Sequence, residues 1–139
     1  MSYKWFKLYT FNPSTTNLET VHTQIKKLLN DQPSNIQVAF LISIHELIIN
    51  SIQESNHLGL QNEISIALFK DETLYYAWVS DYGRGLSNIL TVKSSDDLLK
   101  ERGRGLEIVQ SLSDCFYVCK GRDQLNYFII TKNEEALET

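Results

Sequence analysis

The chain has 139 residues and a mass of 16.0 kDa, which suits one domain and leaves too little chain for two independent cores. Hydrophobic residues make up 42% and charged residues 22%, a composition that excludes a disordered chain and predicts a globular one. The net charge of −4 argues against bulk nucleic-acid binding, which depends on clustered Lys and Arg. We therefore expect a single domain over 1–139, with an acidic tail from about residue 133 and no nucleic-acid partner.

The sequence also bears on membranes and on the redox environment. No apolar run approaches the roughly 18–20 residues that span a bilayer, and the N-terminus lacks the apolar core of a signal peptide. We therefore expect a cytoplasmic protein with no membrane partner. On a strand, Cys115 and Cys119 would be roughly 13 Å apart, beyond the ~7 Å that a disulfide allows, so they are predicted to be buried free thiols.

The first half of the chain predicts one strand followed by two helices. Residues 3–11 are rich in aromatic side chains with partial alternation, as in a strand. Apolar residues at helical spacing predict a helix over about 17–30, and Pro33 interrupts it. A second, longer helix is expected from about 34 to 57, with Gly59 at its C-terminal end.

The next segments predict a hairpin, a loop and a third helix. Alternating apolar residues predict a β-hairpin with strands over 62–70 and 73–80. The polar segment 87–102 is predicted to be a mobile loop. A short amphipathic helix is expected over 105–113.

Two further strands, about 115–120 and 125–131, are expected to close the domain. The strands therefore come in adjacent pairs, and the strict strand-helix-strand alternation of a doubly wound parallel sheet is absent. This order predicts an α+β fold. We expect a two-layer α/β sandwich whose mixed, mainly antiparallel sheet is covered on one face by helices.

Four polar residues follow one line along the second helix. At 100° per residue they fall within about 40° of one another: Glu46, Asn50, Gln53 and His57. Such a line is typical of a solvated helix face. However, Ile42 flanks it, and a carboxylate one turn before an amide can place a general base beside a divalent cation. The opposite side is apolar and is expected to face the core: Leu41, Ile44, Ile48 and Ile52.

Two glycine-rich segments are candidates for ligand contact. Asp81-Tyr82-Gly83-Arg84-Gly85 has the composition of an ordinary turn, but its glycines also let the backbone approach a ligand closely. Arg102-Gly103-Arg104-Gly105 leads into a helix, whose first N–H groups can bind an anion while the arginines pair with phosphate. Neither segment continues as a Walker A loop or as a dinucleotide-binding fingerprint.

In order and spacing, these motifs resemble the N, G1 and G2 boxes of the GHKL ATPase superfamily. The length and the strand-helix-helix start are similar to those of stand-alone anti-sigma factor serine kinases from bacterial partner-switching systems. The resemblance covers about residues 3–131 and implies a Bergerat-type ATP-binding fold with ATP and Mg²⁺ as cofactors. It also implies phosphorylation of a small antagonist protein, binding of that antagonist or of a sigma factor, and a homodimer.

The resemblance implies a role for each matching residue. Glu46 would be the general base that takes the proton from an attacking serine hydroxyl. Asn50 would be the Mg²⁺ ligand. Asp81 would accept a hydrogen bond from the adenine amino group, and residues 87–102 would form a lid over ATP.

The matching glycines would surround the nucleotide. By resemblance, Gly83 and Gly85 would pack beside the adenine base. The phosphate-binding turn would comprise Gly103, Gly105 and Leu106. Charge and position alone make two arginines candidates for contact with the γ-phosphate, namely Arg102 and Arg104.

Two departures from the family pattern leave alternatives open. Glu54 stands where members often carry His, and no Thr follows Gly121 in the late Gly-Thr position. A non-catalytic ATP-binding module that switches a partner protein therefore remains an alternative. A detached histidine kinase catalytic domain is another, although His45-Glu46 lacks the following Pro and the second helix of a phospho-acceptor site.

Overall fold

Strands from both ends of the chain join one sheet in the computed structural model of the protein. The structure describes residues 5–13, 16–58, 63–82, 91–93, 104–120 and 125–132. Within this part the helices are α1 (Leu18–Leu28), α2 (Ser34–Leu58) and α4 (Arg104–Leu112). The strands are β1 (Trp5–Phe11), β2 (Glu63–Lys70), β3 (Leu74–Tyr82), β4 (Thr91–Lys93), β5 (Cys115–Lys120) and β6 (Leu125–Lys132).

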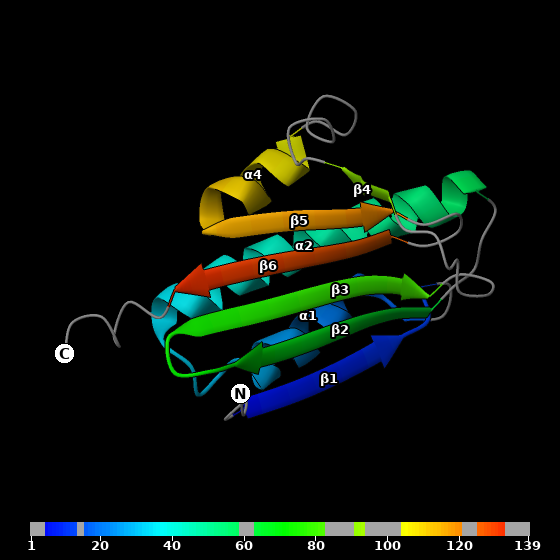
Figure 1. Ribbon diagram of the computed structural model, residues 1–139. Coiled ribbons are helices and arrows are strands. Elements are labelled where there is room, and N and C mark those ends of the chain that lie inside the picture. The colour runs from blue at the N-terminus through cyan, green and yellow to red at the C-terminus, as the bar shows by residue number, and fades with distance from the viewer. Residues whose placement is uncertain are drawn as a thin grey trace.

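The sheet has the strand order β1-β2-β3-β6-β5-β4, and the helices cover one of its faces (Figure 1). The α+β class and the two-layer sandwich are therefore confirmed. The expectation of a mixed sheet is wrong, because every pairing among the described strands is antiparallel. The last two strands form a hairpin, and β6 enters the sheet antiparallel to β3, so no parallel neighbour arises.

The predicted helices and strands are present, with bounds that differ by only a few residues. The segment 87–102 is predicted to be a mobile loop with no strand, but Thr91–Lys93 forms β4 and pairs with β5. Short strands at a sheet edge carry little sequence signal, because one ladder and three residues are enough to define them. The rest of 87–102 lies outside the described residues.

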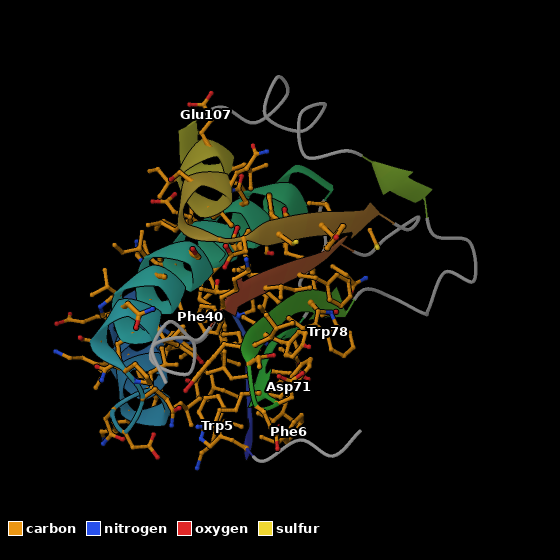
Figure 2. The ribbon with its side chains drawn as sticks, turned by 60° about the vertical axis from the view of Figure 1, so that its left-hand side comes forward. Trp5, Phe6, Phe40, Asp71, Trp78 and Glu107 are labelled. Atoms are coloured by element: carbon orange, nitrogen blue, oxygen red, sulfur yellow. The ribbon has the colours of Figure 1, made fainter. Side chains whose placement is uncertain are left out.

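Local interactions explain where α1 begins and which way the side chains of β1 face. Asn17 caps α1, and its Oδ1 accepts a hydrogen bond from the N–H of Thr20 at 2.9 Å. In β1, exposed and covered side chains alternate, so that Phe6 faces away from the helices whereas Trp5 packs on the core side. Figure 2 shows these two side chains on opposite sides of the strand.

The core lies between the sheet and α2. Phe40 of α2 meets Tyr75 of β3 edge to face, with ring centroids 6.4 Å apart. Figure 2 shows Phe40 directed from the helix layer toward the sheet. One cluster of buried side chains joins residues from α1, α2 and α4 to the sheet, so the described elements share a single core.

Helix α2 contacts α1 and α4 as well as the sheet. Ile44 and Ile48 are buried as predicted, whereas Leu41 and Ile52 are only partly covered. The first half of the polar line of α2 is not solvated, because Asn50 is buried and Glu46 is half-buried, whereas Gln53 is exposed. Helix α4 covers these two residues, since its Gly105 approaches both of them, and α1 contacts α2 at His45.

The expectation that no segment is long and apolar enough to cross a membrane is also corrected. Residues 34–53 of α2 meet that description by length and composition, and half of this segment is buried inside the protein. A core helix enclosed by α1, α4 and a sheet needs apolar residues on most of its circumference.

The two cysteines are free, as predicted, but they are not buried. Cys115 is exposed and Cys119 is partly exposed. Both lie on β5, where Phe116 and Val118 take the inward positions. Because side chains alternate along a strand, the two cysteines share the face that points away from the helices.

Candidate functional site

The start of α4 lies against the side of α2 that carries Glu46 and Asn50. A Cβ added to Gly105 would lie 2.8 Å from Oε2 of Glu46 and 3.3 Å from Nδ2 of Asn50. A side chain at this position would therefore displace the Glu46 carboxylate. Glycine allows the backbone at the start of α4 to approach a carboxylate and an amide on a neighbouring helix.

A hydrogen bond orients the Asn50 side chain. Its Nδ2 donates to the backbone oxygen of Glu46 at 2.9 Å, one turn earlier in α2. With the nitrogen directed at the helix backbone, Oδ1 is the side-chain atom with which Asn50 can accept a hydrogen bond or ligate a cation. The contact also ties the position of Asn50 to the same turn of helix that carries Glu46.

Apolar anchors hold the start of α4 in place. Leu106 and Val109 are fully buried, and α4 contacts both α2 and β5. Glu107, in the first turn, is exposed on the outer side of α4 (Figure 2). The first N–H groups of a helix lack partners within the helix and carry partial positive charge, so they favour an anion at this position.

Asp81 brings a carboxylate to the same layer from the sheet. It lies near the end of β3, is buried, and shares one face of the strand with the core-facing residues Ala77 and Val79, two and four residues earlier. Its side chain is therefore on the side of the sheet that α2 covers. Figure 1 shows that β3 and α2 both end on the same side of the molecule.

The structure thus brings together three of the predicted positions, Glu46, Asn50 and Gly105, and buries Leu106 in the core. Asp81 faces the same layer from β3. Arg104 begins α4, but its side chain is outside the described part. The remaining predicted positions also lie outside the described residues: Gly83, Gly85, Arg102 and Gly103.

The sequence motifs do not include Ser51, a polar residue beside this site. Ser51 follows Asn50 in α2 and is fully buried, and its Oγ has no hydrogen-bond partner within the described residues. Leaving a buried hydroxyl unpaired costs on the order of 1–3 kcal/mol, so a water or ligand group is expected to meet it. Helical spacing could have predicted the burial of Ser51, because it places this residue one turn after the buried Leu47.

The chain matches no protein-family model, and a search of curated proteins finds no match. The chemistry of the site therefore rests on its own residues. These are a carboxylate and an amide one turn apart, a second carboxylate buried in the sheet, and a helix start that approaches the first two through a glycine. Such a set can hold a cation, move a proton and bind an anion.

Proposed function

We propose that this protein binds ATP with Mg²⁺ in a Bergerat-type fold and acts as a protein serine kinase and anti-sigma regulatory factor. Its substrate would be a small antagonist protein in a cytoplasmic partner-switching pathway. The observation that carries the proposal is the approach of Gly105 to Glu46 and Asn50. Gly105 is more than fifty residues from Glu46 and Asn50 in the sequence, and the resemblance implies that these two motifs lie side by side at the ATP site.

The described residues fit the two cofactors. Mg²⁺ is commonly held by one or two protein oxygens together with substrate phosphates, and Asn50 can supply one such oxygen. The N–H groups at the start of α4 suit the phosphates, because the glycine at position 105 leaves room beside Glu46. Asp81 is the acceptor proposed for the adenine amino group.

The proposed mechanism assigns one task to each residue. ATP would supply the phosphoryl group to the serine oxygen and leave as ADP, and Mg²⁺ held by Asn50 would offset the charge of the phosphates. Glu46 accepts the proton of the attacking serine hydroxyl. The α4 N–H groups orient the phosphates, and Leu106 and Val109 fix this helix start against the core.

A non-catalytic ATP-binding module is the second candidate. It is favoured by Gly121, which is followed by Arg and not by the Thr of the family pattern, and by Glu54 in place of His. Such a protein would bind a sigma factor or antagonist in a nucleotide-dependent manner without transferring phosphate.

Thermal unfolding with and without nucleotide tests the shared step of both candidates. At an ATP-Mg²⁺ concentration of about 100 times Kd, binding adds about 2.7 kcal/mol, which raises Tm by on the order of 10 °C for a domain of this size. An unchanged Tm at millimolar ATP and Mg²⁺ would contradict both candidates.

Phosphoryl transfer separates the two candidates. With radiolabelled ATP and the antagonist protein, the wild-type chain is expected to produce phosphoserine. Glu46→Gln should retain the ATP-dependent rise in Tm but lose transfer, because the amide cannot accept the serine proton. Glu19→Gln is the matched control, since Glu19 is an exposed carboxylate on α1. ATP binding without any phosphoserine would favour the binding module.

A further inference from the structure

Two of the three histidines of the chain meet where α1 packs on α2. The ring centroids of His22 on α1 and His45 on α2 are 5.8 Å apart, and the two ring planes are perpendicular. Figure 1 shows both helices in one layer on the same side of the sheet. The packing of the helices therefore brings together two imidazoles that are more than twenty residues apart in the sequence.

The seam beneath the two rings is apolar and tightly filled. A void of only about 10 Å³ remains there, lined by both histidines and by aliphatic side chains of both helices, among them Val21, Ile25 and Ile44. A void of this size holds at most one water, so the interior of the seam has no room for a ligand. His22 is exposed and His45 is half-buried, so both rings can be reached from solvent at the rim of the seam.

The ring nitrogens of both histidines are available as ligands. Among the residues that the structure describes, no hydrogen bond engages either imidazole. A neutral imidazole carries one nitrogen with a lone pair, and this nitrogen is a common ligand of Zn²⁺, Ni²⁺ and Cu²⁺. Two such nitrogens on different helices form the donor set of a metal site that would join the helices.

The separation of the two rings suits a single tetrahedral ion. With Zn–N bonds of about 2.0–2.1 Å, two imidazoles on one Zn²⁺ have ring centroids on the order of 5 Å apart. The separation of 5.8 Å between His22 and His45 is close to this value. In the perpendicular arrangement one ring must turn before both nitrogens face the same point. His22 is exposed, so it can change rotamer without displacing core side chains.

Water would complete the coordination of such an ion. Within the described part of the chain, no group of three or more His, Cys, Asp or Glu side chains is placed to hold a metal, so this site offers two protein ligands. Imidazole nitrogen favours Zn²⁺ and its neighbours over Mg²⁺, which prefers oxygen ligands. The donor set therefore selects a transition-metal ion and not the magnesium of the proposed nucleotide site.

We propose that His22 and His45 bind one Zn²⁺ ion, which ties α1 to α2. The two imidazoles are adjacent only in the folded chain, so the ion would bind the folded state and stabilise it. The proposal does not depend on the proposed kinase function. Glu46 follows His45 but points about 100° further around α2, where Gly105 of α4 approaches it. A chain without any ATP response would still be expected to bind zinc.

Calorimetric titration of the full chain with ZnCl₂, together with thermal unfolding, tests the proposal. Wild-type protein should bind one Zn²⁺ per chain, and Tm should rise by a few °C at ~10 times Kd. His22→Gln and His45→Gln should each raise Kd at least ~10-fold, because a single imidazole remains and glutamine is not a comparable zinc ligand. His22→Gln changes an exposed residue, so it keeps the test decisive even if His45→Gln alters the circular dichroism spectrum.

Two matched controls separate this site from other zinc ligands of the chain. His57→Gln removes the third histidine. A variant with Cys115→Ser and Cys119→Ser removes both free thiols, which also bind zinc well. Both variants should keep the wild-type Kd for Zn²⁺. Excess MgCl₂ should not raise this Kd, because Mg²⁺ competes poorly for imidazole.

Three outcomes would overturn the proposal. They are the absence of binding heat and of a Tm rise at millimolar ZnCl₂, an unchanged Kd in both His22→Gln and His45→Gln, and loss of zinc binding in the cysteine variant. Electron paramagnetic resonance of the chain loaded with Cu²⁺ gives an independent readout. Coupling to two imidazole nitrogens that falls to one in His22→Gln would support the site, whereas a spectrum without imidazole coupling would contradict it.

Discussion

Gly105 is the residue at which the proposed site is most sensitive to a small change. In Gly105→Ala, the new methyl group would lie 2.8 Å from the Glu46 carboxylate, whose flexible end can move aside. We expect the fold to tolerate the change, because the Glu46 side chain can shift and alanine has a higher helix propensity than glycine. The displaced carboxylate and amide should reduce the ATP-dependent rise in Tm.

The measurement compares Tm with and without ATP-Mg²⁺ for Gly105→Ala and for Ser111→Ala. Ser111 is exposed on the same helix, and its hydroxyl donates only to a backbone oxygen within α4. An equal nucleotide response in wild type and Gly105→Ala would show that the start of α4 is not part of the binding site.

Residue identities predicted the site only in part. The helical spacing of Glu46 and Asn50 predicted a shared line on α2, and this line exists. Spacing could not show that α4 covers that line, because the covering helix comes from a segment more than fifty residues later in the chain. The burial of Asn50 therefore followed from tertiary packing, which one helix viewed alone does not reveal.

At the scale of elements, the β2–β3 hairpin depends on Asp71. Its Oδ1 accepts hydrogen bonds from the N–H groups of Leu74 and Thr73 at 2.8 and 2.9 Å, and its Oδ2 accepts from the Tyr76 hydroxyl at 3.0 Å. These bonds, first that from Leu74 and then that from Thr73, hold the pKa of Asp71 below its usual range.

Because the folded state lowers this pKa, the stabilisation is present above the unfolded value of about 3.9 and is lost as pH falls through the lower folded value. Asp71→Asn should therefore lower Tm at pH 7, and its difference from wild type should shrink at more acidic pH. Glu63→Gln, at the start of β2, is the control for loss of a carboxylate in the same hairpin. A difference that stays constant with pH would contradict this account of the turn.

The sequence was most informative about the individual helices and strands. Aromatic alternation in β1 and the apolar stripe of α1 are local signals, and each is found in the structure. The parallel or antiparallel sense of the β3–β6 pairing was not local. It depends on where the last hairpin enters the sheet, and propensity contains no information about that position.

At the scale of the whole molecule, one core predicts one unfolding transition. The buried cluster joins Phe11 of β1 to Phe40 of α2, Leu106 of α4 and Ile129 of β6. At fixed protein concentration, urea unfolding followed by far-ultraviolet circular dichroism and by tryptophan fluorescence should give superimposable curves. Trp5→Phe restricts the fluorescence to Trp78 of β3. Separate midpoints for the two signals would indicate that the sheet and the helix layer unfold independently.

The strand order also has a consequence for synthesis. β3 pairs on one side with β2, which precedes it, and on the other side with β6, which is made last. At ~5–20 residues per second, a ribosome needs several seconds to extend the chain from Tyr82 to Leu125. During that interval β3 is an open edge, able to pair with another nascent chain. Correct assembly therefore depends on keeping the open edge of β3 apart from other nascent chains until β6 is synthesised.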